Sequence, residues 1–314
     1  MRYIDLHCDT LTRALELGAR DMLSLPEAML DVRRLRAAGA LGQVFAVYFP
    51  PRSELRRRFG MDDEAFFCAC AKIYHNTFGR SRSPRGFAHF VSGRADPPAF
   101  FPVLSLEDGR ILSGKPGNIA RFRDLGVQLI TLTWNEPNCL GFPCSSDARI
   151  MERGLTPFGI DAVWEMNRRG VAVDVSHLSD GGFWDVLRHS ERPFLASHSN
   201  ARAVHKHPRN LTDDMLRAIA RRGGIVGLNF APSISGTGGS EQLLRHARHI
   251  LRVGGEDILA LGSDLDGFQE SSELCSARHI AALPEYFHGS GFSCDATEKL
   301  AYRNALRFFE DVCD

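Results

Sequence analysis

GVAVDVSHLSD, residues 170–180, and PFLASHSN, residues 193–200, are the stretches on which the predicted fold rests. Each is a short apolar, β-branched run typical of a buried strand, and each ends in a Ser-His pair, with His177 in the first and His198 in the second. GGFWDVLRHS, residues 181–190, has the length and composition of a helix. Strand, helix and strand in succession imply parallel pairing, which puts both histidines at carboxyl ends of strands, the edge where α/β barrels hold their active sites.

Taken alone, each histidine could equally well be a hydrogen-bonded structural residue or a functional one. Because the same arrangement occurs twice, the pair favours a metal site.

Apolar runs of this kind begin near residues 3, 43, 101, 127, 171, 193, 224 and 257, mostly with helical patterns between them. Eight strands that alternate with helices predict an α/β fold, the (β/α)8 barrel of the TIM type. The clearest helical patterns cover residues 26–38, 62–78, 158–169, 212–222 and 240–253. We expect a single domain over residues 1–314, with closing helices at about 277–314.

The composition argues against several kinds of partner. The 38 basic and 38 acidic residues balance, and no basic motif is interleaved with aromatics, so neither nucleic acid nor a membrane surface is expected. The eight cysteines form no disulfide or four-cysteine zinc pattern and suit a reducing cytoplasm. No run approaches the roughly 18 apolar residues of a membrane span. We expect the mature protein to begin at or near Met1, and GRSRSPRG at residues 79–86 to be a solvated loop.

A metal-binding pair of residues lies at the end of the first predicted strand. His7 and Asp9 are two residues apart, so strand alternation points both away from the face that carries Ile4 and Leu6. A histidine and an aspartate at this spacing are suited to bind one metal ion, although Asp9 before Thr10 could equally cap a turn.

Other polar residues follow later strands. Glu107 follows the apolar PVLSL, where an unpaired buried carboxylate would be costly, although an exposed acid at the start of a loop is equally plausible. Asp264 ends another apolar run and suits general acid or base work beside a metal. Arg209 could anchor a substrate carboxylate, whereas His205 and His207 are expected to be bystanders. The loop from Trp134 to Thr156 is long for a barrel connection and could cover a substrate.

Together, the ends of strands 1, 3, 5, 6 and 8 carry three carboxylates and three imidazoles, a set that suits zinc or a similar divalent ion. One tetrahedral centre needs fewer ligands, so we expect two ions. Two ions roughly 3.5 to 4 Å apart, bridged by a carboxylate and a solvent molecule, generate hydroxide at neutral pH and polarise a scissile carbonyl.

A series of motifs runs in order along nearly the whole chain: DLHCDT, LSLEDG, GVQLITLTWN, GLTPFG, MNRRGVAVDVSHLSD, PFLASHSNARAVHKHPRNLTDDMLRAIARRGGIVGLNF and LGSDLDG. They resemble the membrane (renal) dipeptidase family of zinc peptidases, family M19, within the amidohydrolase-like barrels. The resemblance implies a metal-dependent hydrolase barrel and a zinc-dependent dipeptidase that cleaves the amide bond of small dipeptides by a metal-bridging hydroxide. Some members accept a D-residue at the carboxyl side, some open penem β-lactams, and relatives are often homodimers.

Carried over by position, the resemblance implies two Zn²⁺ ions. The first would bind His7, Asp9 and Glu107. The second would bind His177, His198 and the same Glu107, which would bridge the two ions.

The resemblance also implies roles in substrate binding and proton transfer. Asp264 would pass the proton of the attacking water to the leaving amine, and Arg209 would hold the terminal carboxylate of the dipeptide. Many members carry a histidine after the fourth strand that is thought to stabilise the oxyanion or the substrate carbonyl, where this chain has Trp134. We expect Asn135 or Asn138 to supply a replacement hydrogen bond to the substrate, and Trp134 to be a pocket wall or a packing residue.

This departure leaves two alternatives open. The same binuclear site could serve another amide, lactam or lactone hydrolase. The chain could also be a metal-binding homologue without catalytic activity, although the retention of all five presumed ligands and of Asp264 argues against it.

Overall fold

Eight parallel strands form a closed barrel in a computed structural model that describes residues 1–79, 100–269 and 272–313. The strands follow one another in chain order, and β8 pairs back to β1. They are β1 (Tyr3–Cys8), β2 (Ala40–Tyr48), β3 (Phe101–Glu107), β4 (Val127–Thr131), β5 (Ala172–Asp174), β6 (Leu195–Ala196), β7 (Ile225–Leu228) and β8 (Leu259–Leu261). The predicted (β/α)8 barrel is therefore confirmed. The loop expected at residues 79–86 lies outside the described residues, except for Gly79.

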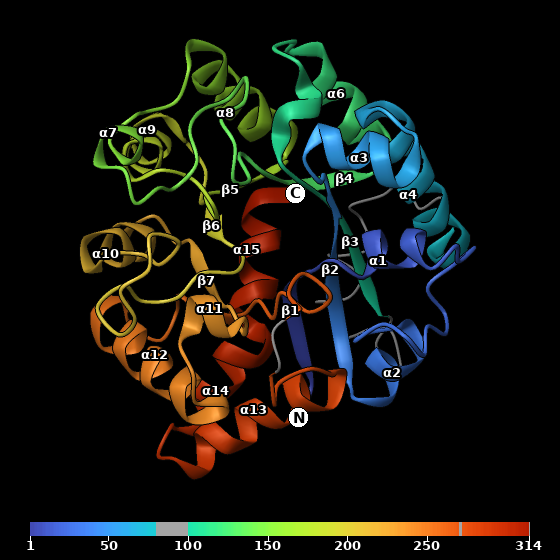
Figure 1. Cartoon of the computed structure of the whole chain (residues 1–314). Coiled ribbons are helices and arrows are strands. Elements are labelled where there is room, and N and C mark those ends of the chain that lie inside the picture. The colour runs from blue at the N-terminus through green and yellow to red at the C-terminus, as the bar shows by residue number, and fades with distance from the viewer. Residues whose placement is uncertain (80–99, 270–271, 314) are drawn as a thin grey trace.

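Helices connect the strands and surround the barrel (Figure 1). They are α1 (Thr10–Glu16), α2 (Val32–Ala37), α3 (Arg52–Phe59), α4 (Asp63–Phe78), η1 (Gly109–Leu112), α6 (Gly117–Asp124), α7 (Ala148–Met151), α8 (Pro157–Arg169), α9 (Asp180–His189), α10 (Asp213–Arg221), α11 (Pro232–Ser235), α12 (Gly239–Gly254), α13 (Ala277–Gly289), α14 (Cys294–Glu298), η2 (Lys299–Arg303) and α15 (Asn304–Cys313). The long connection after β4 is an irregular loop that contains only the single turn α7.

Capping side chains decide where several helices begin. The hydroxyl of Thr212 accepts a hydrogen bond from the backbone N–H of Met215 and caps α10, at the start of the helical pattern predicted over residues 212–222. The helix predicted over residues 26–38 is wrong in its first part, because α2 begins only at Val32. Asp31 has an extended backbone there and caps α2 by accepting from the N–H of Arg34.

The last helix closes the amino-terminal end of the barrel. Inward-facing side chains near the starts of strands, such as Leu41, Ala172 and Ile225, form one buried cluster with Phe308 and Phe309 of α15. Figure 1 shows α15 across the middle of the ring of helices. Since apolar side chains fill this end, polar chemistry is left to the carboxyl end.

A buried aspartate ties three strands together at that carboxyl end. Asp174, the last residue of β5, accepts hydrogen bonds from the Thr131 hydroxyl of β4 at 2.6 Å and from the backbone N–H of Ser176 at 3.0 Å. It also accepts from both the N–H and the hydroxyl of Ser197, at 2.9 and 2.6 Å. Four donors compensate for the burial of this carboxylate.

Asp5 makes the matching connection across the other side of the barrel. Its carboxylate accepts from the N–H and the hydroxyl of Ser263, both at 2.7 Å, and from the Gln43 side chain at 2.8 Å. Burial raises the pKa of Asp5, against these hydrogen bonds, which lower it. Strands β1 and β2 and the end of β8 are thereby held together.

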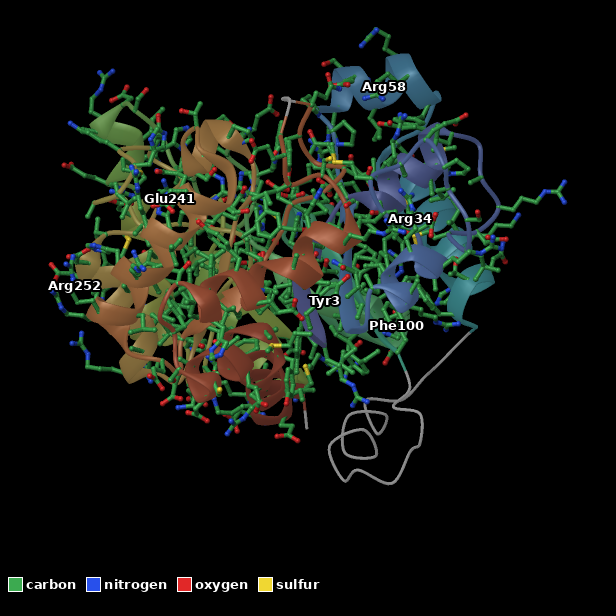
Figure 2. The ribbon with its side chains drawn as sticks, turned by 90° about the horizontal axis from the view of Figure 1, so that it is seen from below. Tyr3, Arg34, Arg58, Phe100, Glu241 and Arg252 are labelled. Carbon is green, nitrogen blue, oxygen red and sulfur yellow. The ribbon has the colours of Figure 1, made fainter. Side chains whose placement is uncertain are left out.

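Several charged side chains of the surrounding helices lie on the outside of the molecule. In Figure 2, Arg58, Glu241 and Arg252 stand toward the periphery, whereas Tyr3 lies inside, where its side chain is buried. None of the helices in the described ranges is long and apolar enough to cross a membrane.

Two glycines, Gly227 and Gly262, allow the backbone to pack closely against Ser197, the residue after β6. A Cβ atom built on Gly227 or on Gly262 would overlap the carbonyl oxygen of Ser197, and each would also meet the Cα atom of the other glycine at 3.0 to 3.1 Å. Any larger residue at either position would push Ser197, and with it His198, toward the barrel axis or away from β7.

We predict that Gly262→Ala lowers the free energy of unfolding by about 1–3 kcal/mol, because an added methyl group in a packed interior forces a backbone shift. Urea unfolding measures the change. Gly117→Ala in the first turn of α6, where a Cβ has nothing within 4 Å, is the control and should be neutral within about 1 kcal/mol. Equal stability of the two variants would contradict the close approach.

Candidate active site

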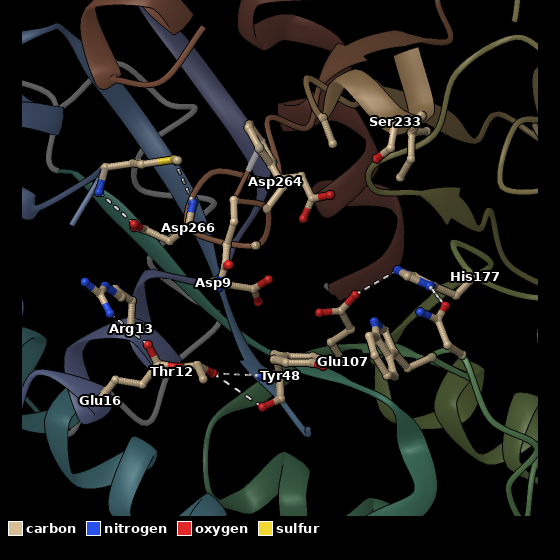
Figure 3. Close-up of a pocket in the computed structure, with 18 of the residues that line it drawn as sticks. Asp9, Thr12, Arg13, Glu16, Tyr48, Glu107, His177, Ser233, Asp264 and Asp266 are labelled. Atoms are coloured by element: carbon tan, nitrogen blue, oxygen red, sulfur yellow. Dashed lines mark hydrogen bonds and ion pairs between the residues drawn. The ribbon is translucent and has the colours of Figure 1, made fainter. Parts of the chain in front are cut away.

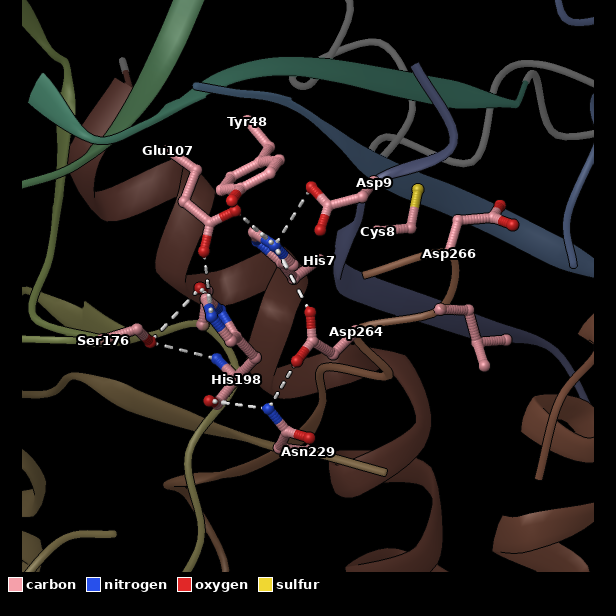
Figure 4. Close-up of polar contacts among 12 residues, drawn as sticks. His7, Cys8, Asp9, Tyr48, Glu107, Ser176, His198, Asn229, Asp264 and Asp266 are labelled. Carbon is pink, nitrogen blue, oxygen red and sulfur yellow. Dashed lines mark hydrogen bonds and ion pairs between the residues drawn. The ribbon is translucent and has the colours of Figure 1, made fainter. Parts of the chain in front are cut away.

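Six side chains predicted from the sequence converge at the carboxyl end of the barrel (Figure 4). They form three overlapping groups, and within each group the potential ligand atoms lie within 4.8 Å of one another. The groups are His7, Asp9 and Glu107; Glu107, His177 and His198; and His7, His198 and Asp264. All six are buried. The register of β1 shifts between Asp5 and Cys8, so simple strand alternation does not hold there, yet His7 and Asp9 face the same cluster as predicted.

Glu107, the last residue of β3, lies between two of these groups. Its Oε2 is 3.5 Å from Nε2 of His7. Its Oε1 is 3.0 Å from Nε2 of His177 and 3.4 Å from Nε2 of His198. The two carboxylate oxygens therefore face different histidines, an arrangement suited to a ligand shared by two ions.

Hydrogen bonds behind the two later histidines determine which ring nitrogen carries the proton. Nδ1 of His177 lies 3.0 Å from Oδ1 of Asn135, which can only accept, so Nδ1 must donate. Nδ1 of His198 lies 2.7 Å from the hydroxyl of Ser197, which itself donates to Asp174. The Nε2 atoms of both rings are then unprotonated acceptors.

These two acceptor nitrogens lie only 3.1 Å apart and share a neighbour, Oε1 of Glu107. Three atoms that can all act as acceptors and face one point are stabilised by a cation placed between them. Burial, followed by the positive charge of Arg209, lowers the pKa of His177 to about 4, and burial lowers that of His198. Neutral imidazole is the form that binds a metal.

The group around His7 has unpaired polar atoms. Nε2 of His7 lies 3.5 to 3.8 Å from Asp9, Glu107 and Asp264, too far for good hydrogen bonds. Among the described residues, neither ring nitrogen of His7 nor Oδ1 of Asp9 has a hydrogen-bond partner. Burial alone would lower the pKa of His7, but the three carboxylates raise it to about 10. The carboxylates that favour a proton on this ring would also favour a metal cation in place of that proton, so these unpaired atoms fit a metal here as well.

Asp264 is held in place by a residue that sequence reasoning missed. Nδ2 of Asn229 donates to Oδ2 of Asp264 at 2.9 Å and to the carbonyl oxygen of His198 at 3.3 Å. Burial raises the pKa of Asp264 to about 6, despite the lowering effect of His7. His177 and Asp264 both have left-handed backbone conformations, with φ of 66° and 63°, a strained geometry that is typical of functional residues.

Arg209 is buried beside the cluster. Its Nη1 donates to the Ser199 hydroxyl at 3.3 Å and its Nη2 to the carbonyl oxygen of His198 at 3.2 Å, whereas its Nε has no partner among the described residues. His205 and His207 stack on each other and belong to none of the metal-binding groups found in the described part of the chain.

A cavity of about 820 Å³ opens onto the cluster (Figure 3). Its inner wall includes Asp9, Glu107 and Asp264, and its outer wall carries ion pairs among residues of α1 and α3. These outer residues are Arg13, Glu16, Glu54 and Arg58.

The loop from Trp134 to Thr156 contributes to this cavity only through its first residues. Trp134 and Asn135 line it, and the Trp134 ring packs edge-on against Tyr48, with ring centres 5.0 Å apart. Asn138 does not line the cavity, because it donates to Asp108 and Leu132 and accepts from two backbone N–H groups of the loop. Asn138 is therefore a structural residue of the loop and not the substrate donor that the sequence suggested.

Comparisons with known proteins show what the whole chain resembles. A family model described as membrane dipeptidase (peptidase family M19) matches residues 1–314. A protein of Klebsiella pneumoniae, described as uncharacterized and from the pqqA 5′ region, is 35% identical over 223 residues, which are 67% of this chain and 81% of that protein.

Two solved structures resemble the whole chain. The crystal structure of a metallopeptidase named dipeptidase AC has a TM-score of 0.84 and 28% identity, over 100% of this chain and 99% of that one. A metallopeptidase of Rhodobacter sphaeroides, bound to a phosphinate mimic of the dipeptide L-Ala-D-Ala, has a TM-score of 0.84 and 26% identity, over 99% of each chain.

The hydrogen-bond chain behind His198 predicts the effect of one substitution. Ser197→Ala removes the acceptor for Nδ1 of His198 and should weaken zinc binding by roughly 10- to 100-fold, the usual effect of losing a group that orients a ligand. Titration against a competing zinc chelator measures the affinity. The control is Ser190→Ala, which also removes a buried hydroxyl with two hydrogen bonds, in this case to Oδ1 of Asn167 and to the carbonyl oxygen of Arg192. Unchanged affinity in Ser197→Ala would contradict the orienting role.

Proposed function

The chain belongs to the membrane dipeptidase family, peptidase family M19, and is a metallo-dipeptidase; we propose that it binds two zinc ions and cleaves small dipeptides that have a free carboxylate. The observation that carries the proposal is the set of buried acceptor atoms of His177, His198 and Glu107 that face one another at 3.0 to 3.4 Å. A cation placed between these atoms would stabilise the set.

The proposed zinc ligands are those that the family resemblance implied. His7 and Asp9 would hold one ion, His177 and His198 the other, and Glu107 would bridge them. The two sides of the Glu107 carboxylate support this assignment, since they face different histidines. When bound, zinc supplies Lewis acidity, which activates water and polarises an amide carbonyl.

The chain's own residues perform the remaining steps. We propose that Asp264 takes the proton of the attacking water and delivers it to the leaving amine, with Asn229 fixing one carboxylate oxygen so that the other faces the cavity. Arg209 is proposed to bind the terminal carboxylate of the dipeptide, which its buried, unpaired Nε supports.

Asn135 keeps its proposed place in the substrate site, because it lines the cavity. Its Oδ1 is engaged with His177, so only its amide nitrogen is available to a substrate. Trp134 is proposed to form the neighbouring wall.

Substrates with a D-residue at the carboxyl side are also proposed, because the Rhodobacter sphaeroides relative binds a mimic of L-Ala-D-Ala. A cytoplasmic location is proposed because the eight cysteines form no disulfide pattern in the sequence. The single domain over the whole chain and the homodimer stay predictions.

The activity is tested with a panel of L,L and L,D dipeptides, their carboxyl amides, acylated amino acids and lactams, with and without a chelator. We expect dipeptide cleavage that the chelator abolishes and zinc restores. Dipeptide amides should show roughly 10- to 100-fold lower kcat/KM, the value of a charge-assisted hydrogen bond to Arg209. Cleavage that survives metal removal would refute the metallopeptidase mechanism, and a preference for lactams or acylated amino acids would support the alternative hydrolase.

Asp264→Asn should lower kcat by about 10²- to 10⁴-fold, the usual contribution of general acid or base catalysis, while zinc content stays near that of the wild type. Zinc is measured by atomic emission and kcat with the best dipeptide of the panel. Asp257→Asn, an exposed residue before β8 that pairs with Lys299, is the control. Retained turnover in Asp264→Asn would remove Asp264 from the mechanism.

A further inference from the structure

One tyrosine in the active-site cavity has a hydroxyl without a partner. The chain has five tyrosines. Three of them hydrogen-bond within the protein: Tyr3 to the carbonyl of Ala277, Tyr74 to the carbonyl of Pro102, and Tyr286 to the carboxylate of Glu241. Tyr302 does not line the cavity. Among the described residues, the hydroxyl of Tyr48 has no such bond. The Tyr48 side chain is half-buried and lines the cavity, so a partner for its hydroxyl would come from the cavity.

Tyr48 stands at the point where the reaction is proposed to occur. It is the last residue of β2, lies opposite Glu107 in the β2–β3 register, and lines the cavity. Both close-up views show its ring beside Glu107 at the edge of the cluster (Figures 3 and 4). The ordinary pKa of a phenol is about 10, so at neutral pH the hydroxyl keeps its proton and can donate.

Contacts from two other elements hold Tyr48 in place. Its backbone N–H donates to the Thr12 hydroxyl at 3.2 Å, and that hydroxyl donates to the Tyr48 carbonyl at 3.4 Å. Trp134 packs edge-on against the phenol ring, with an angle of 62° between the ring planes. A donor fixed before the substrate arrives costs little reorganisation in the transition state.

We propose that the Tyr48 hydroxyl donates a hydrogen bond to the substrate carbonyl oxygen as that oxygen becomes negative during hydrolysis. The inference rests on the proposed dipeptidase function. When the oxygen of water bonds to the amide carbon, the carbonyl π pair moves to the carbonyl oxygen, where Tyr48 stabilises it. The pair then re-forms the carbonyl as the carbon–nitrogen bond breaks, and the amine leaves with the proton that Asp264 delivers.

Two other kinds of polar group that line this cavity are less suited to that position. The charged groups of the inner wall, Asp9, Glu107 and Asp264, only accept when ionised. The amide nitrogen of Asn135 belongs to an exposed loop residue that already orients His177. Tyr48 is on a strand and is held on both sides.

The test compares Tyr48→Phe with Tyr286→Phe, which removes a hydroxyl from the outer surface of α13. For each variant, kcat, KM, zinc content and inhibition by a phosphinate dipeptide mimic are measured. Tyr48→Phe should lower kcat by about 100-fold, the usual effect of losing one oxyanion donor, with KM and zinc content near wild type. The phosphinate, which resembles the tetrahedral state, should bind more weakly by a similar factor. Tyr286→Phe should match the wild type in all four measurements.

Three results would overturn the inference: kcat of Tyr48→Phe within a few-fold of wild type, a rise in KM alone, or loss of zinc together with activity. The first shows that the hydroxyl is not used, the second that it binds the ground state, and the third that it supports the metal site. A wild-type enzyme without chelator-sensitive dipeptide cleavage would overturn the proposed function, and the inference with it, whereas an active wild type with an active Tyr48→Phe overturns the inference alone.

Discussion

The main constraint on the structure is the crowding of buried acceptor atoms at the carboxyl end of the barrel. Nε2 of His177, Nε2 of His198 and Oε1 of Glu107 face one another at 3.0 to 3.4 Å, and both rings carry their proton on the far nitrogen. Asp9 and Asp264 add negative charge around His7. A buried set of this kind is unstable by itself and becomes stable when cations fill it. The function of the chain follows from that requirement.

The rest of the barrel holds these atoms in position against their repulsion. Asp174 connects β4, β5 and the residues after β6, and through Ser197 it determines the proton position on His198. Asp5 connects β1 and β2 with the residues after β8, so His7 and Asp264 are fixed from the same side. Apolar side chains, among them Phe308 and Phe309 of α15, fill the opposite end of the barrel. Polar connections at one end and apolar packing at the other leave a rigid rim around an open cavity.

The barrel and the clustering of the six polar side chains could be predicted because each depends on local sequence. A strand pattern that ends in a polar residue places that residue at the rim of a parallel barrel, whichever strands are its neighbours. The residues behind the ligands could not be predicted in this way, because their partners come from distant strands: Asn229 meets Asp264 across 35 residues, and Asn135 meets His177 across 42. Asn138 was misassigned for the same reason, since its bond to Asp108 is visible only in the fold. The start of α2 was predicted too early, at residue 26, because the residue that caps this helix is Asp31.

The central claim is that two cations share Glu107. A crystal structure of the zinc-loaded protein, with anomalous data collected on either side of the zinc absorption edge, tests it most directly. The account predicts two anomalous peaks, one against His7 and Asp9 and one against His177 and His198, with the Glu107 carboxylate between them. A single peak, or two peaks with Glu107 bound to only one of them, would contradict the account.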